Sequence, residues 1–254
     1  MPHNYLFIDE CGDPEFYGKR KKLLLGEPGY QPLLILGLVE TADRRALREA
    51  VLAFRQQILA DPLYRSIYSV KQPGWYLHAK DDPPEVRAEF FKFIRTYPDL
   101  RFHAVIARKE LVIFTQKHNN KPSEFYFDIV YHLLHERLQG DCDNCIYLAH
   151  KAKSTLKQLT SAVDKAILAD SRQRMIAYEC QIQQSSQMPE LSVVDYFLWA
   201  LQRYLRQGEI RFWEAVEQRV GSVVDLYDNQ TTYDGVANRL RIDKMKPFGG
   251  LFGQ

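Results

Sequence analysis

The chain lacks long apolar runs and any clear excess of charge of one sign. Its 254 residues contain 34 Lys and Arg against 32 Asp and Glu, which leaves a formal net charge of +2. A charge this small gives no global attraction to phosphate, so a nucleic-acid function would have to rest on local features. The longest apolar run, residues 33–39, is far too short to span a bilayer, and we expect no membrane association.

Cysteine is scarce as well, with four residues in the whole chain. That number is typical of reduced thiols in a cytosolic protein rather than of a disulfide framework. The N-terminus has no basic region followed by a long apolar core, so we expect a cytoplasmic protein without a secretion signal. No Gly-rich phosphate loop, Gly-x-Ser-x-Gly elbow or His-Glu-x-x-His sequence occurs, which removes support for Walker-type, serine hydrolase and zincin chemistry.

What is present is the pattern of a folded α/β protein. Hydrophobic residues make up 46% of the chain and aromatic residues 13%, whereas disordered chains are poor in aromatics. Apolar runs at residues 5–9 and 33–39 predict two buried strands that could pair as a hairpin. Helical and strand patterns then alternate from about residue 75, which predicts an α/β fold with a mixed sheet of about five strands and helices on both faces. The later strands are expected at 101–107, 145–149 and 175–182, and helices begin at the expected caps Thr41, Asp82 and Ser123.

Two acidic residues occupy places suited to ligand chemistry. Asp9 ends the first strand, where a carboxylate can bind a ligand or merely cap the following turn. Strand alternation directs the neighbouring Glu10 to the opposite face. Asp195 lies at the edge of the apolar stripe of a helix over 191–205, on the side that meets the sheet, although an acid there can also interact with the helix dipole.

A second group of residues is chemically able to bind zinc. His132 and His135 precede Cys142 and Cys145 in an order that zinc sites use. The two histidines also fit an ordinary amphipathic helix, and no second Cys-x-x-Cys supports the site. A zinc-stabilised interaction protein is therefore one hypothesis. The basic run Lys19–Lys22 and the later Lys151, Lys153 and Lys157 could attract phosphates, or simply be solvated.

Three stretches of the chain resemble, in order, the sequence blocks of a mostly bacterial family, the domain of unknown function 3800 family. Residues 7–13, Phe-Ile-Asp-Glu-Cys-Gly-Asp, are similar to its apolar-Asp-Glu-Ser-Gly-Asp opening. Residues 77–87 resemble its His-Ala-x-x-Asp block followed by Val-Arg. Residues 191–203 resemble its Leu-Gln-x-Ala-Asp-Tyr block followed by Trp-Ala and Arg.

The resemblance implies a ribonuclease H-like domain over residues 1–208, with residues 209–254 as a C-terminal extension packed on it and a tail expected to be mobile. In such folds an acid on the first strand and one on the last helix meet beside the sheet, and Asp9 and Asp195 match these places. Such a pair holds Mg²⁺ or Mn²⁺ for phosphodiester hydrolysis. Glu10 and His78 are then further catalytic candidates, and Lys80, Lys151 and Lys153 are candidates for substrate binding.

The chain also departs from that pattern. Cys11 stands where the family has Ser, and Ser192 where it has Gln. Ribonuclease H-like enzymes commonly place another acid on the fourth core strand, where this chain offers His150 as a neutral metal ligand. Glu10, Asp13 or His78 could compensate for the missing charge.

The leading hypothesis is therefore a Mg²⁺- or Mn²⁺-dependent nuclease acting on DNA or RNA. The alternative is a catalytically weak or silent accessory module that binds nucleic acid or protein, for example in a mobile-element or defence system.

Overall fold

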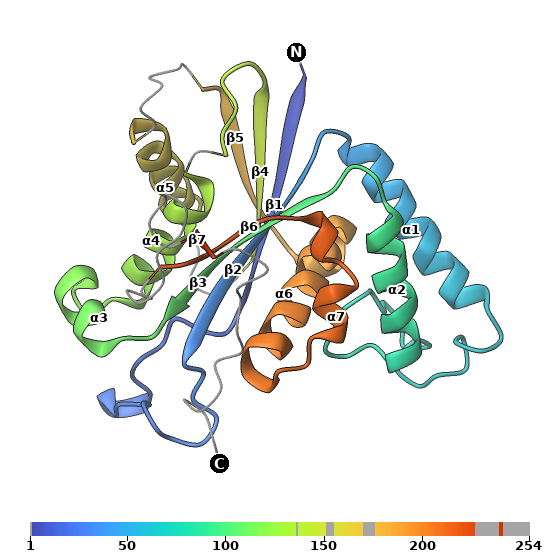
Figure 1. The fold of residues 1–254 in the computed structure, drawn as a ribbon, viewed down its shortest axis with the longest axis horizontal. Coiled ribbons are helices and arrows are strands. Elements are labelled where there is room, and N and C mark those ends of the chain that lie inside the picture. Colours follow the sequence, from blue (N-terminus) through green and yellow to red (C-terminus); the bar gives the residue numbers. More distant parts are fainter. Residues whose placement is uncertain (1, 136, 151–154, 170–175, 227–238, 241–254) are drawn as a thin grey trace.

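The chain forms a twisted mixed sheet covered by helices on both faces (Figure 1). The computed structural model describes residues 2–135, 137–150, 155–169, 176–226 and 239–240. Within these residues the sheet has seven strands in the order β5-β4-β1-β2-β3-β6-β7. Their bounds are β1 His3–Cys11, β2 Leu33–Thr41, β3 Arg101–Arg108, β4 Asp143–Ala149, β5 Tyr178–Gln183, β6 Val220–Asp225 and β7 Arg239–Leu240.

Strand directions follow from the connections. β1, β2 and β3 form an antiparallel meander, so the predicted pairing of the first two strands is confirmed. β4 runs parallel to β1, β5 runs parallel to β4, and β6 runs parallel to β3. The expected five strands are all present, and β6 and β7 extend the sheet beyond β3.

The helices lie in two layers. One face of the sheet carries α1 Arg44–Ala60, α2 Pro84–Thr96, α6 Pro189–Gln207 and α7 Arg211–Glu214 (Figure 1). The other carries α3 Leu111–His118, α4 Pro122–Leu134 and α5 Leu156–Leu168. The predicted fold class, a mixed α/β sheet with helices on both faces, is therefore confirmed. None of the helices in the described ranges has the length and apolar character that a membrane-spanning segment needs.

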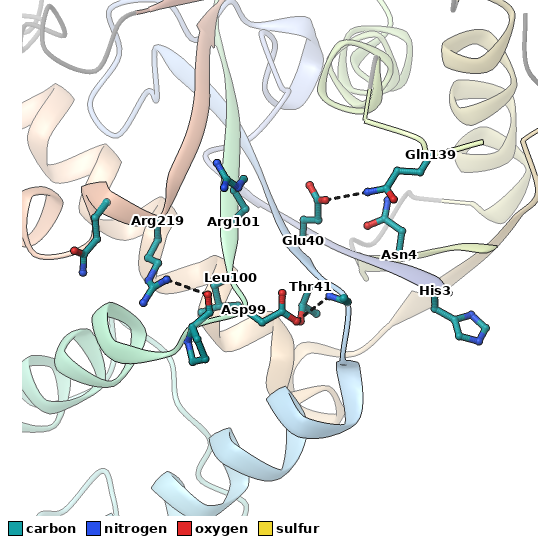
Figure 2. Close-up of a pocket in the computed structure, with 12 residues that line it drawn as sticks. His3, Asn4, Glu40, Thr41, Asp99, Leu100, Arg101, Gln139 and Arg219 are labelled. Carbon is teal, nitrogen blue, oxygen red and sulfur yellow. Dashed lines mark hydrogen bonds between the residues drawn. The ribbon is translucent and has the colours of Figure 1, made fainter. Parts of the chain in front are cut away.

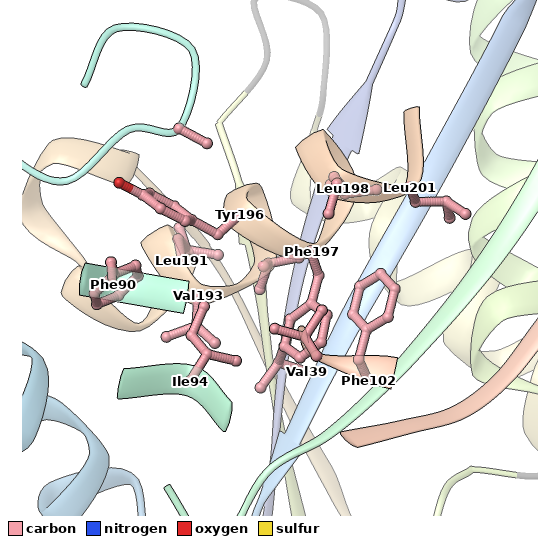
Figure 3. Packing of buried hydrophobic residues seen from close by; sticks show 14 of the residues in the cluster. Val39, Phe90, Ile94, Phe102, Leu191, Val193, Tyr196, Phe197, Leu198 and Leu201 are labelled. Atoms are coloured by element: carbon pink, nitrogen blue, oxygen red, sulfur yellow. The ribbon is translucent and has the colours of Figure 1, made fainter. Parts of the chain in front are cut away.

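Alternation along β1 divides the core into two apolar clusters. Phe7 packs into the cluster under α6, whereas Leu6 and Ile8 pack into the cluster under α4. Figure 3 shows the cluster under α6, where Phe197 of the helix stacks on Phe102 of β3 with ring centroids 4.5 Å apart. Each such side chain stabilises the fold by about 1.5–3 kcal/mol through burial.

Helix α6 approaches the sheet closely because a glycine lies beneath it. A Cβ at Gly37 of β2 would lie 2.9 Å from the Leu198 side chain and 2.7 Å from Phe102. Only glycine therefore accommodates the helix at this distance. The close approach brings the N-terminal half of α6, which carries Asp195, beside β1.

Some predicted helix caps are wrong. Thr41 belongs to β2, and the side chain of Asp43 caps α1 by accepting the N–H of Ala46 at 2.9 Å. Ser123 lies inside α4, which begins at Pro122 without a side-chain cap. Proline at the first helical position has no N–H to satisfy, so the start of α4 has one unpaired donor fewer that a cap would have to meet.

The C-terminal extension contributes to the sheet. Beyond residue 208, β6 pairs with β3 and extends the sheet at the edge opposite to β5. The boundary at residue 208 stays a prediction. The Gly-rich tail that we expected to be mobile lies outside the described residues.

Candidate functional site

The two acids that sequence reasoning paired are 186 positions apart in the chain and lie on β1 and on the helix that packs beside it. Asp9 is on the β1 face that Phe7 shares, towards α6, and Asp195 is on α6 itself. Burial raises the pKa of the Cys11 thiol to about 12, and the charges of Asp195 and Asp9 contribute to that rise. Both carboxylates therefore lie within electrostatic range of the Cys11 thiol at the end of β1, and their role as one catalytic pair stays a prediction.

Asp195 also holds the loop that carries His78. One of its carboxylate oxygens, Oδ2, accepts the backbone N–H of Ala79 at 2.6 Å. The other, Oδ1, lies 3.8 Å from Nε2 of His78, whose Nδ1 lies 3.2 Å from Oδ2 of Asp81. The His78 side chain is 31% exposed and the Asp195 side chain 23% exposed, so both remain open to a ligand. The structure thus brings His78 into the same site as Asp195.

Asp82 has a different role from the helix cap that the sequence predicts. It is 2% exposed, and its Oδ1 accepts the indole N–H of Trp75 at 2.9 Å. Its Oδ2 accepts the N–H of His78 at 2.9 Å and the hydroxyl of Tyr196 at 2.6 Å. Helix α2 begins after it, with Pro83 in the capping position and no side-chain cap. Asp82 therefore organises the loop from inside.

Arginine contacts complete the attachment of this loop to α6. Arg87 donates to the carbonyl oxygens of Ala79 at 2.7 Å and Asp82 at 2.6 Å. Its guanidinium lies 4.3 Å from the ring centre of Trp199, and that of Arg203 lies 4.8 Å from it. Arg203 also pairs with Glu209, which agrees with the packing and ion-pair role expected for Trp199 and Arg203. The second and third family-like blocks are thus one interlocked unit.

We call Asp9, Asp81, Asp82 and Asp195 the acidic cluster. Burial raises the pKa of the Asp195 carboxyl, and the nearby Asp82 and Asp81 carboxylates raise it further, while His78 and the Ala79 N–H lower it. Burial also raises the pKa of Tyr76, with contributions from Asp195, Asp81, Asp9 and Asp82. The carboxylates of the cluster therefore disfavour the ionised forms of Asp195 and Tyr76, in addition to the larger effect of burial.

Glu10 and His150 lie away from the face of the sheet that carries Asp9. Oε2 of Glu10 accepts the hydroxyl of Tyr126 of α4 at 3.0 Å, on the opposite face, as strand alternation predicted. His150 is exposed and follows the end of β4, where its N–H bonds to the carbonyl of Gln183 at 2.8 Å. One step beyond the Ile8–Leu148 pair, the β4 residue next to Asp9 is Ala149.

The remaining predicted residues are scattered. Asp13 lies 3.2 Å from Nζ of Lys109 and is engaged in an ion pair. Lys80 is exposed at the turn between His78 and Asp81. Lys151 and Lys153 lie outside the described residues.

Sequence reasoning overlooked Arg206. It is exposed, and its charge lowers the pKa of the same Cys11 thiol that the acids raise. The signal is its spacing, because 11 residues after Asp195 make three helical turns and return to the same face of α6. One face of α6 thus carries the carboxylate of Asp195 in its N-terminal half and the exposed guanidinium of Arg206 near its C-terminal end.

The donor types suit Mg²⁺ or Mn²⁺, which prefer oxygen ligands. Within the described ranges, however, no three or more His, Cys, Asp or Glu side chains gather in a way that could hold a metal. Mg²⁺ is commonly held by one or two protein carboxylates, with waters and substrate phosphates completing its shell. Asp9 and Asp195 are two carboxylates of the kind that such a site takes from the protein.

The zinc hypothesis fails on geometry. Cys145 packs against the cluster under α6, whereas α4, which carries His132, covers the opposite face of the sheet. Cys142 donates its thiol to Oε1 of Gln139 at 3.4 Å. The described side chains form no three-ligand group here either, so His132, His135, Cys142 and Cys145 do not form a zinc site.

A polar pocket of about 250 Å³ lies at the other end of β1, near its N-terminus (Figure 2). Oδ2 of Asp99 accepts the Thr41 hydroxyl at 2.6 Å and the N–H of Ala42 at 2.9 Å. Oε1 of Glu40 accepts the Gln139 side-chain amide at 3.2 Å. Arg101 also lines this pocket, which we call the pocket end of the sheet.

Comparisons with known proteins identify no family for the chain. No family model and no curated protein matches it. Among solved structures it is similar to a chain in the PCNA:RNase HII complex from Archaeoglobus fulgidus, with 11% sequence identity and a TM-score of 0.44. The match covers 84% of this chain and 76% of that chain. Membership of the domain of unknown function 3800 family stays a prediction.

Proposed function

We propose that the protein is a Mg²⁺- or Mn²⁺-dependent phosphodiesterase that cleaves nucleic acid. The observation that supports the proposal is that the charges of Asp9 and Asp195 both act at Cys11, at the end of β1, and that Asp195 lies 3.8 Å from His78. Carboxylates are costly to bury without partners. Here Asp195 is buried beside Asp81 and Asp82, and burial together with these two neighbours raises its pKa.

In this proposal Asp9 and Asp195 hold the metal. A divalent cation so bound would activate water and stabilise the leaving oxygen of a phosphodiester. Asp195 has a second task, because its bond to the Ala79 N–H fixes the loop that presents His78. His78, between Asp81 and Asp195, can give or take a proton. Arg206, on the same face of α6, can contact a phosphate next to the reacting one.

The test is cleavage of labelled single- and double-stranded DNA and RNA with Mg²⁺ or Mn²⁺. Asp9→Asn and Asp195→Asn should each lower the rate at least about a hundredfold, because each removes a charge needed in the transition state. An asparagine at 195 keeps an oxygen for the Ala79 N–H, so the loop should stay in place. Asp164→Asn, at an exposed position bonded to Tyr178, is the matched control. Absence of cleavage with either metal would refute the proposal, as would full activity of Asp9→Asn.

A catalytically silent module that binds nucleic acid is the second candidate. It is favoured by Ala149 at the β4 position next to Asp9, where a further carboxylate would strengthen metal binding. Such a module would retain nucleic-acid affinity when Asp9 and Asp195 are both changed to asparagine. It would also show no cleavage of any tested substrate in the wild-type form.

A further inference from the structure

The connection between β1 and β2 contains a small hairpin with a cationic tip, residues 16–24, which we call the basic finger. The N–H of Leu24 bonds to the carbonyl of Phe16 at 3.0 Å, and the N–H of Gly18 to that of Lys22 at 2.8 Å. An antiparallel bridge joins Tyr17 and Leu23. The finger is thus a hydrogen-bonded structure, and its tip consists of Lys19, Arg20, Lys21 and Lys22, all exposed.

The backbone of the tip is strained. Arg20 and Lys21 have φ values of 57° and 59°, in the left-handed region. A hairpin turn with positive φ at both central residues normally uses Asn and Gly. Non-glycine residues in this conformation cost about 1–2 kcal/mol each. A sequence that required only the turn would avoid this cost, so the two cations at these positions indicate a use for their charge.

The base of the finger is firmly held. Phe16 is 2% exposed and stacks on Phe114 of α3. Lys109, whose side chain is fully buried, lies 3.2 Å from Asp13 and 4.4 Å from the ring centre of Tyr30. These contacts tie both arms of the connection to the domain. The cations are therefore presented on a fixed support, which lowers the entropy lost on binding.

The finger projects from the end of the sheet that carries the acidic cluster. The chain leaves β1 at Cys11, two residues beyond Asp9, and returns to the sheet at Leu33 (Figure 1). Gly12 makes this exit possible, because it has a φ of 100° and a Cβ there would lie 2.4 Å from the carbonyl oxygen of Leu33. A strand of nucleic acid that crosses this end of the sheet would meet the finger after leaving Asp9 and Asp195.

We propose that the basic finger binds the phosphate backbone of a nucleic-acid strand, outside the acidic cluster. This inference rests on the proposed action on nucleic acid. Adjacent exposed cations on a rigid support suit a polymer with regularly spaced phosphates. Lysine is depleted in protein–protein interfaces, so a run of Lys and Arg favours nucleic acid over an acidic protein as the partner.

The test measures binding of a fluorescent 30-nucleotide DNA or RNA in EDTA, so that no cleavage is needed. Arg20→Asn/Lys21→Asn removes two charges while keeping residues that tolerate positive φ. Arg45→Gln/Arg101→Gln removes the same charge at the pocket end. The finger variant should bind about tenfold more weakly, and its slope of log K against log salt should fall by about 1.4–1.8. The control should stay within about twofold of wild type.

Three results would overturn the inference. The first is a finger variant with the affinity and salt slope of the wild type. The second is an equal loss of oligonucleotide affinity in the finger variant and the control variant. The third is a wild-type protein that binds polyglutamate more tightly than DNA or RNA. The proposed catalytic function is judged separately. Loss of binding in the finger variant without any wild-type cleavage supports the finger and refutes the nuclease. If the wild type cleaves nucleic acid and the finger variant binds it as tightly as the wild type does, the nuclease proposal is supported and the inference about the finger is refuted.

Discussion

The two ends of β1 both carry several acidic side chains, but they use them differently. At the pocket end, Asp99 accepts a hydroxyl and backbone N–H groups, and Glu40 accepts an amide and lies 3.6 Å from Nε2 of His103. At the other end, burial raises the pKa of Asp195, and the neighbouring Asp82 and Asp81 carboxylates raise it further. Carboxylates matched to donors stabilise a fold, whereas crowded carboxylates indicate a place for a cation.

Asp82 shows that the distinction depends on donors rather than on location. It lies in the acidic cluster, yet three donors meet its two oxygens, as donors meet Asp99 at the pocket end. We therefore assign Asp82 to the support of the site. Asp9 and Asp195, which accept the backbone N–H groups of Glu10 and Ala79, stay the proposed metal ligands because of their place at the end of β1.

The largest effect on stability is expected from Asp82→Ala. It would leave the indole of Trp75, the N–H of His78 and the hydroxyl of Tyr196 without their buried acceptor, so the free energy of unfolding should fall by about 3 kcal/mol. Urea denaturation measures this loss. Tyr196→Phe removes only one of these bonds and should cost about 1 kcal/mol. If both variants lose the same small amount, the supporting role of Asp82 is wrong.

Asp99→Ala should have the next largest effect on stability. The substitution removes the acceptor for the Thr41 hydroxyl and for the N–H groups of Ala42 and Asp43, at a cost of about 1–2 kcal/mol. Nucleic-acid cleavage, corrected for the folded fraction, should stay within about twofold of wild type. A catalytic loss as large as that of Asp9→Asn would mean that the two ends do not differ in the way described.

Asp195→Asn should stabilise the protein slightly at pH 7 in the absence of metal. The pKa of Asp195 is raised in the fold, so its charged form is less favourable there than in the unfolded chain, and removing the charge relieves this cost. We expect a gain of up to about 1 kcal/mol by urea denaturation. A loss above that size would instead show that the charge itself holds the loop at Ala79.

The smallest effect concerns acid conditions at the pocket end. Burial lowers the pKa of His103, while its neighbours Glu40 and Arg137 oppose each other. The unfolded histidine, with a pKa of about 6.5, takes up a proton before the folded one does. Stability is therefore present above pH 6.5 and is lost as the pH falls towards the lowered value. His103→Gln should reduce this dependence between pH 7 and 5, and an unchanged profile would contradict the assignment.

Much of the fold could be predicted because local patterns and burial agree. Apolar spacing alone shows which side chains of β2, β3 and α6 face the core. On β3 these are Phe102, Ala104 and Ile106, which alternate along the strand. β6 was missed because a six-residue strand near one side of the sheet has a weak pattern of its own. Its place depends on pairing with β3, more than a hundred residues earlier.

The site was predicted in part for the same reason. Strand alternation separated Asp9 from Glu10, and helical spacing placed Asp195 against the sheet. The interpretation of Asp82 as a cap failed because Asp-Pro-Pro reads locally as a helix start, while the partners that decide its role include Tyr196, 114 positions away. His150 was expected near Asp9 from its strand, but extending the Ile8–Leu148 pairing by one residue puts Ala149 beside Asp9.

The most direct test of the central claim is Mn²⁺ binding to the protein without nucleic acid. Titration calorimetry would compare wild type, Asp9→Asn/Asp195→Asn and the pocket-end control Asp99→Asn. We predict that the double variant binds Mn²⁺ at least about tenfold more weakly than wild type, a loss of about 1.4 kcal/mol or more, and that the control binds as wild type does. Equal Mn²⁺ affinity in the wild type and the double variant would contradict the account.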